Sequence, residues 1–259
     1  MIDEIFARCP EMFAAARDRA EEDWFAAKAH THERHKFMLF PSIEVLARFR
    51  DYHIGGIGLE PIDHMVKIAQ FETQHFEKIQ IPSFSRDDQK LVFRVNLNTL
   101  NAVVRSLQGV VGTGNYSKKF RDVLLENMVD TPINGGFFGN IKIFERKIFT
   151  SGFAIRTAHR TAIASELYNR ESTTPPLAIM ELGGGFGKSL ADLVRIFPTA
   201  TAFYVDLPLN MAVAAHYFDG RFPGRVNLVW RDTDAVRAGM INVVAPWLID
   251  KIDLQIDLM

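Results

Sequence analysis

The chain has 259 residues, 30 basic and 31 acidic side chains, and a single cysteine, Cys9. A formal net charge of −1 gives no reason to expect a nucleic acid or an anionic membrane surface as a partner, and one cysteine excludes an internal disulfide. The sequence shows neither a basic and apolar leader segment nor a run of about 20 apolar residues. We therefore expect no membrane insertion, a cytoplasmic location and one or two domains.

Helical patterns dominate the first half of the sequence. Apolar residues recur there at spacings of three and four, which is typical of amphipathic helices. Four helices are expected, at residues 12–25, 43–49, 91–111 and 120–128. We therefore predict that residues 1–150 form a mainly helical region.

A glycine-rich stretch follows these helices at residues 134–140. Three glycines around Phe137 and Phe138 predict a tightly turning or flexible loop. Such a loop is a domain boundary or a lid over a site, or else an ordinary connector whose phenylalanines pack in the core.

In the second half, short apolar runs alternate with helical patterns. Strands are expected at residues 177–181, 202–206, 226–230 and 254–259, with a further short strand in 241–247. Helices are expected at residues 153–168, 189–197 and 209–222. This alternation predicts an α/β fold in which residues 151–259 form a Rossmann-like, doubly wound sheet.

The most informative motif is ELGGGFG at residues 181–187, between the first of these strands and its helix. Glycine is needed where a backbone turns tightly around a bulky cofactor and adopts a positive φ. A dinucleotide fingerprint would need a glycine in place of Lys188, and a phosphate-binding P-loop would need one in place of Leu182. The pattern E-x-G-x-G-x-G is met in full, by Glu181, Gly183, Gly185 and Gly187.

Together with YVDLP at residues 204–208, this motif resembles the class I S-adenosylmethionine-dependent methyltransferases, and more narrowly the sugar O-methyltransferase family. The resemblance covers residues 150–259 and reaches the first half only loosely. It implies an enzyme that binds S-adenosylmethionine and methylates a hydroxyl of a sugar or glycoconjugate, with the N-terminal region 1–150 shaping the acceptor site. In such enzymes the sheet continues beyond its fourth strand, so we expect a domain truncated at that point.

The resemblance also implies how the cofactor is bound. Asp206, at the end of the second strand, is expected to accept hydrogen bonds from both ribose hydroxyls, or alternatively to cap the following helix. Glu181 is expected near the amino group of the cofactor, or else in a salt bridge, and Phe186 either contacts the cofactor or plugs the turn. The expected cofactor-binding residues are Glu181, Gly183, Gly185, Phe186, Gly187, Asp206 and Asp232.

One acidic residue and one group of histidines are further candidates for ligand binding. Asp232 follows the strand expected at 226–230 and is expected near the adenine amino group, or alternatively in a solvated loop. The group His30, His32 and His35 lacks the H-E-x-x-H spacing of a zinc-binding helix. We therefore expect no metal site.

The proton acceptor of the reaction is not identifiable from the sequence. His159 and His216 are candidates because imidazole titrates near neutral pH, although each also fits an ordinary helix surface. Arg156 and Arg160 could bind sugar hydroxyls or a phosphate, or they form a solvated basic helix face.

Two functions from different classes stay open. The first is an active sugar O-methyltransferase, and the second is a catalytically inactive or truncated methyltransferase-like scaffold module. The glycine spacing disfavours a nicotinamide-dependent oxidoreductase. The sequence fixes neither the acceptor sugar nor the oligomeric state, and a homo-oligomer stays open.

Overall fold

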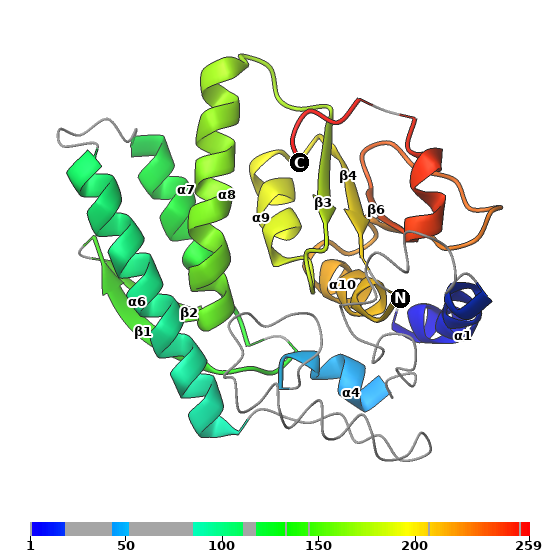
Figure 1. Cartoon of the computed structure of the whole chain (residues 1–259), viewed down its shortest axis with the longest axis horizontal. Helices are drawn as coiled ribbons and strands as arrows, with labels where there is room; N and C mark the ends of the chain where they lie inside the picture. The colour runs from blue at the N-terminus through cyan, green and yellow to red at the C-terminus, as the bar shows by residue number, and fades with distance from the viewer. Residues whose placement is uncertain are drawn as a thin grey trace.

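Figure 1 shows the computed structural model of the chain, which describes residues 2–18, 43–51, 85–110, 118–132, 134–144, 146–206, 208–253 and 255–259. The elements in chain order are α1 (Ile2–Asp18), α4 (Ile43–Ala47), η1 (Phe49–Asp51), α6 (Arg86–Val110), α7 (Lys118–Met128), β1 (Phe138–Ile143), β2 (Arg146–Ser151), α8 (Gly152–Glu171), β3 (Ala178–Leu182), α9 (Lys188–Ile196), β4 (Thr201–Val205), α10 (Pro208–Arg221), β5 (Val226–Val229), β6 (Ile241–Val244) and η2 (Pro246–Lys251). The fold is therefore α/β, with a four-stranded parallel sheet that is compatible with a Rossmann-like fold.

Helices overlap all four ranges expected in the first half, although α1 begins ten residues before the expected start at residue 12. The starts of α6 and α8 have identifiable causes. α6 begins with a capping box, because the Asp88 amide donates to Ser85 Oγ (3.1 Å) and the Ser85 amide donates to Asp88 Oδ2 (3.1 Å). α8 begins at the N-cap Ser151, whose Oγ accepts from the Ala154 amide at 3.1 Å. Residues 19–25 of the first expected helix lie outside the described residues.

A β-hairpin that the sequence pattern did not predict joins α7 to α8. Strands β1 and β2 pair antiparallel, and of the loop expected at 134–140 only residues 134–137 are a turn, whereas residues 138–140 are the first residues of β1. The Phe137 ring packs edge-on against Phe93 (centroids 5.9 Å apart), and the Phe138 ring stacks on Phe149 (5.4 Å). The two phenylalanines pack against neighbouring rings but are only half-buried, so they are not part of the core as the connector alternative expected.

The parallel sheet has the strand order β3-β4-β6-β5. The expected third strand, β5, lies at the outer edge, and β6 lies between β4 and β5, although only a further short strand was expected there. Buried amides fix this arrangement: Asn227 Nδ2 donates to Asn242 Oδ1 (2.8 Å), and Asn242 Nδ2 donates to the Ala202 carbonyl (3.3 Å). Because buried amides need partners, these bonds favour the observed strand order.

The prediction of a strand at residues 254–259 is wrong for the residues that the structure describes. Among the described residues of this segment, only Leu258 pairs with the sheet, in an isolated parallel bridge to Ile179. The Asp257 carboxylate accepts hydrogen bonds from the amides of Leu177 (2.7 Å) and Ala178 (3.0 Å). These side-chain bonds occupy amides next to the bridge, and so the segment runs beside β3 without forming a ladder.

The two connections from β3 to β4 and from β4 to β5 both step across the sheet in the same direction. The chain steps from β3 through α9 to β4, and from β4 through α10 to β5 (Figure 1). Parallel crossovers are right-handed in nearly all proteins, so two steps in the same direction place both helices on one face. The doubly wound arrangement, which needs helices on both faces, therefore stays a prediction.

Within the part of the chain that the structure describes, the buried hydrophobic residues form two cores. The first core joins the sheet and its helices to α1, α4 and η1 from the N-terminal region. The second core joins α6, α7 and the hairpin to α8. None of the described helices has the length and apolar composition that a membrane-spanning helix requires.

Candidate functional site

The turn between β3 and α9 contains three alternating glycines in the left-handed region. The φ angles are 67° at Gly183, 65° at Gly185 and 81° at Gly187. Left-handed backbone is costly for residues with a Cβ, so this spacing of glycines has a conformational cause. The Gly183 amide donates to the Val205 carbonyl at 2.9 Å, which holds the turn against the end of β4.

Asp206 joins the end of β4 to the same turn. Its Oδ2 accepts hydrogen bonds from the Gly185 amide (2.9 Å) and from the Tyr204 hydroxyl (2.9 Å). Tyr204 is fully buried, and burial together with the nearby carboxylates of Asp206 and Glu181 raises the pKa of its hydroxyl well above the usual value. The phenol therefore stays protonated, and its single hydrogen is shared between two acceptors, Asp206 Oδ2 and the Gly185 carbonyl.

Glu181 lies beneath the turn and caps α9. Its Oε2 accepts from the Leu190 amide at 3.1 Å, and a Cβ on Gly184 would lie only 2.2 Å from its carboxyl carbon. The N-cap residue Gly187 has no side chain that could accept a hydrogen bond from the first turn of α9, so the Glu181 carboxyl accepts it instead. Burial raises the pKa of Glu181 to about 7, against opposing hydrogen bonds from Leu190 and Ser189.

The raised pKa gives Glu181 a definite signature in the pH dependence of stability. Between its usual value of 4.5 and about 7, the folded chain keeps a proton that the unfolded chain has lost, so this group's contribution to stability falls as pH rises through that window. Glu181→Gln lacks this titration. We expect its unfolding free energy, relative to the natural chain, to rise by about 1–3 kcal/mol between about pH 4.5 and pH 8. Urea unfolding across this range measures the difference, and a constant difference would contradict the assignment.

Phe186 points from the turn into the core. It is fully buried, and its ring centroid lies 4.2 Å from that of Phe153, 4.9 Å from Tyr217 and 5.2 Å from Phe49. Phe186 thus plugs the turn and connects it to α8, α10 and η1. The alternative of a direct ring contact with a cofactor would require this cluster to open.

Two other residues expected at the site have partners outside the turn. Asp232 is exposed beyond β5, the outermost strand, where its carbonyl accepts from Lys251 Nζ. His216, on α10, lies with Nε2 2.8 Å from Asn134 Nδ2. Because Asn134 Nδ2 also donates to the Ala47 carbonyl (3.0 Å), we assign His216 Nε2 as the acceptor. Burial lowers the pKa of His216, which keeps the ring neutral.

The three basic candidates on α8 differ in their surroundings. The Arg156 guanidinium lies 5.0 Å from the centroid of the Phe153 ring, the ring that contacts Phe186. His159 is half-buried one turn further along the helix, and burial lowers the pKa of its imidazole, with Arg160 adding to this effect. Arg160 is exposed. Arg156 is thus connected to the glycine turn through the rings of Phe153 and Phe186.

A buried polar network below the turn was missed by the sequence analysis. Arg50 Nη2 lies 2.6 Å from Asp130 Oδ2, and Ser151 Oγ donates to the same oxygen at 2.5 Å. Lys188, directly after Gly187, is fully buried and pairs with Asp192 at 2.6 Å. The spacing of four between Lys188 and Asp192 was a readable signal for an ion pair on a helix, whereas Arg50 and Asp130 lie too far apart in sequence to be paired by pattern.

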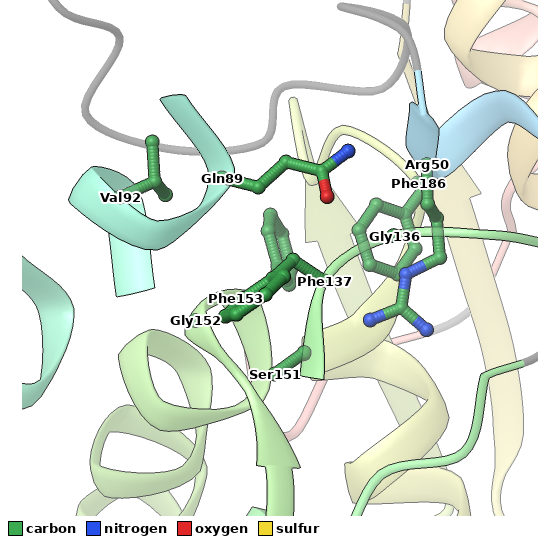
Figure 2. A pocket seen from close by; sticks show the side chains of 9 residues that line it. All are labelled: Arg50, Gln89, Val92, Gly136, Phe137, Ser151, Gly152, Phe153 and Phe186. Atoms are coloured by element: carbon green, nitrogen blue, oxygen red, sulfur yellow. The ribbon is translucent and has the colours of Figure 1, made fainter. Parts of the chain in front are cut away.

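A small cavity lies where the N-terminal region meets the turn (Figure 2). Its volume is about 30 Å³, which is room for about one water molecule. The lining residues are Arg50, Gln89, Val92, Gly136, Phe137, Ser151, Gly152, Phe153 and Phe186. In Figure 2 the Gln89 amide points from α6 toward the side of the cavity that carries Arg50 and Phe186. The helical region therefore contributes polar groups to the back of the glycine turn.

Within the described ranges, no three His, Cys, Asp or Glu side chains are grouped so that they could hold a metal ion. His30, His32 and His35 lie outside those ranges. Comparison with known proteins finds no matching family model, no matching curated protein and no matching solved structure.

Proposed function

We propose that the chain is an S-adenosylmethionine-dependent O-methyltransferase whose acceptor is a hydroxyl of a sugar or glycoconjugate. The observation that carries this proposal is the hydrogen bond from Gly185, in a turn of three left-handed glycines after β3, to Asp206 at the end of β4. Tight glycine turns and an acid at the next strand end are the arrangement that Rossmann-like folds use for adenosine-containing cofactors.

The sheet topology supports a ligand at this edge. β3 has β4 on one side and the bridge of Leu258 on the other, so the chain leaves β3 in one direction and returns on its opposite side. Ligands of open parallel sheets bind at such a switch point, beyond the carboxyl ends of the strands. Leu182 is 50% exposed and Gly183 is exposed, so this end of β3 is accessible.

The residues of the turn fit an adenosyl cofactor. A Cβ on Gly183 would have no atom within 4 Å, so the backbone at this left-handed residue faces open space that a side chain would fill. Asp206 offers a carboxylate, which only accepts hydrogen bonds, as ribose hydroxyls require. Gly183 and Asp206 are therefore the residues expected to hold the cofactor.

The cofactor, when bound, would supply an electrophilic methyl group on a sulfonium. The chain must orient the acceptor hydroxyl, exclude water and receive its proton. His159 and His216 remain the candidates for the proton, and burial keeps each imidazole in the neutral form that accepts one by lowering its pKa. His216 would first have to give up the hydrogen bond that its Nε2 accepts from Asn134. Arg156 and Arg160 remain candidates for binding the sugar acceptor. A contact of Asp232 with the adenine amino group and the formation of a homo-oligomer also remain predictions.

The inactive-scaffold alternative is favoured by one observation. Both acids of the motif already have internal partners, because Glu181 accepts from the amide of Leu190 and Asp206 accepts from Gly185 and Tyr204. These bonds stabilise the turn without any cofactor. A module that binds the cofactor yet methylates no sugar in an acceptor screen would fit this alternative.

Calorimetric titration with S-adenosylmethionine and S-adenosylhomocysteine tests the proposal. We expect saturable binding of both, and binding about 10- to 100-fold weaker in Asp206→Asn, which loses the charge that strengthens hydrogen bonds to the ribose. Asp253→Asn, at an exposed position, is the matched control and should bind like the natural chain. NADH and ATP serve as control ligands. The proposal would be overturned if the folded natural chain bound neither S-adenosylmethionine nor S-adenosylhomocysteine.

A further inference from the structure

The outward face of the β1–β2 hairpin combines basic, amide and aromatic side chains. Successive residues of a strand point to opposite faces of the sheet, and the three isoleucines of the hairpin are buried in the second core. The residues that alternate with these isoleucines point away from the core and are exposed: Asn140, Lys142, Lys147 and Phe149. The hairpin thus has one face in the core and one face that is accessible to a ligand.

Two lysines lie directly opposite each other on this hairpin face. Lys142 and Lys147 are register partners in the antiparallel pair. Directly opposite side chains have Cβ atoms about 4.5–5.5 Å apart, and like charges at that spacing destabilise the pair. Among the described residues neither lysine has an ion-pair partner, whereas Arg146 lies 3.9 Å from Asp122. An anion between the two ammonium groups would therefore relieve their repulsion.

Two phenylalanines extend the hairpin face toward the glycine turn. The Phe138 and Phe149 rings stack with their planes 16° apart, and Phe149 is 43% exposed. The Arg50 guanidinium lies 4.8 Å from the centroid of the Phe138 ring and 5.5 Å from that of Phe186, in the glycine turn. The aromatic end of the face therefore adjoins residues that support the turn. The lysine end lies four residues further along β1, about 13 Å away.

The composition of the hairpin face disfavours two kinds of polyanion. Single-stranded nucleic acids bind by stacking their bases on aromatic faces, but here one face of each ring is covered by the other ring. Sites for anionic lipid headgroups contain clusters of about 4–8 basic residues, whereas two lysines point outward here. Asn140, between Phe138 and Lys142 on the same strand, offers an amide that donates to and accepts from hydroxyl groups. A ligand that carries both hydroxyls and carboxylates matches these groups.

We propose that the hairpin face binds an acidic oligosaccharide, with a uronate carboxylate between Lys142 and Lys147, hydroxyls at Asn140 and a sugar ring against the exposed part of Phe149. The choice of a sugar chain rests on the proposed function, in which the acceptor is a sugar or glycoconjugate. The inference deepens that function by naming the acceptor class as a uronate-containing glycan. The hairpin face holds sugars that are remote from the methylated hydroxyl.

A galacturonate hexamer is the probe for this surface, and its methyl-esterified form is the uncharged match. Calorimetry is carried out at low ionic strength without S-adenosylmethionine. We expect saturable binding of the acid form that weakens as salt is added, and at least about tenfold weaker binding of the ester. Hexaglutamate and a short single strand of DNA represent other polyanions and should also bind at least about tenfold more weakly. Equal binding of the ester, the peptide or the DNA would overturn the inference.

Lys147→Glu separates binding from folding because it places opposite charges across the strand pair. The variant should lose hexamer binding and yet unfold at a higher temperature than the natural chain. Arg237→Glu makes the same change in net charge at an exposed position after β5, and it should bind the hexamer like the natural chain. Natural affinity in Lys147→Glu, or an equal loss in Arg237→Glu, would contradict the assignment of the two lysines.

Titration with S-adenosylmethionine keeps this inference distinguishable from the proposed function. Lys147 lies outside the glycine turn, so Lys147→Glu should bind the cofactor like the natural chain. A natural chain that binds the cofactor but not the hexamer would overturn this inference alone. A natural chain that binds the hexamer but neither S-adenosylmethionine nor S-adenosylhomocysteine would overturn the proposed function and leave the hairpin as a glycan-binding surface.

Discussion

Asp130→Asn is expected to lower the free energy of unfolding by about 3–5 kcal/mol, the cost of leaving a buried partner charge uncompensated. The Asp130 side chain is 1% exposed and Arg50 is 4% exposed, and their ion pair is 2.6 Å long. Ser151 Oγ and the Thr131 amide also donate to this carboxylate, at 2.5 Å and 2.9 Å. Urea unfolding measures the change.

An exposed ion pair provides the matched control for this experiment. Lys90 Nζ lies 2.9 Å from Asp87 Oδ1, but the Asp87 side chain is 90% exposed and that of Lys90 is 44% exposed. Lys90→Gln should therefore cost no more than about 0.5 kcal/mol. If Asp130→Asn proved as mild as Lys90→Gln, the buried pair would not hold η1 against the start of α8.

The same carboxylate predicts how stability changes in acid. Burial alone would raise the pKa of Asp130, but the nearby charges of Arg50 and Lys188 and the hydrogen bonds from Arg50 and Ser151 hold it below the usual value of 3.8. Its contribution to stability is therefore complete above the unfolded-state pKa near 3.8 and is lost as the pH falls through the lower folded-state value. Asp130→Asn should remove this acid-dependent loss below about pH 4.

The parts of the site that the sequence predicted depend on neighbouring residues. The glycine spacing at 183, 185 and 187 predicted a tight turn because each position requires a left-handed backbone, and the structure has φ angles of 65° to 81° there. The helix after the turn was predicted because its apolar spacing is local. The expected place of Asp206 at the end of a strand followed from the same kind of local pattern.

The parts that the sequence could not predict depend on distant pairs. The insertion of β6 between β4 and β5 depends on the bond between Asn227 and Asn242, and nothing in either residue alone indicates its partner. Arg50 and Asp130 are likewise joined only by the fold. Asp232 was expected near the adenine amino group because it follows the third expected strand, and the structure places β6 between that strand, β5, and β4.

Alanine at two glycines of the turn should separate stability from cofactor binding. A Cβ on Gly187 would lie 2.3 Å from Cζ of the fully buried Phe218, in a left-handed backbone with φ 81°. Strain and overpacking together should lower the unfolding free energy of Gly187→Ala by about 2–4 kcal/mol. Gly183 has φ 67° but open space around its Cβ, so Gly183→Ala should cost only about 1–2 kcal/mol.

For cofactor affinity we expect the opposite order, with Gly183→Ala losing more than Gly187→Ala. Each variant is measured below its unfolding temperature. Gly183→Ala places a methyl group in the open space where we propose that S-adenosylmethionine binds, so its affinity should fall at least about tenfold. Gly220→Ala, in α10 with no neighbour within 4 Å, controls for the substitution itself and should be neutral or stabilising by up to about 1 kcal/mol. Natural affinity in Gly183→Ala would mean that the cofactor does not cross this glycine, because a methyl group in its path would clash whatever the stability of the chain.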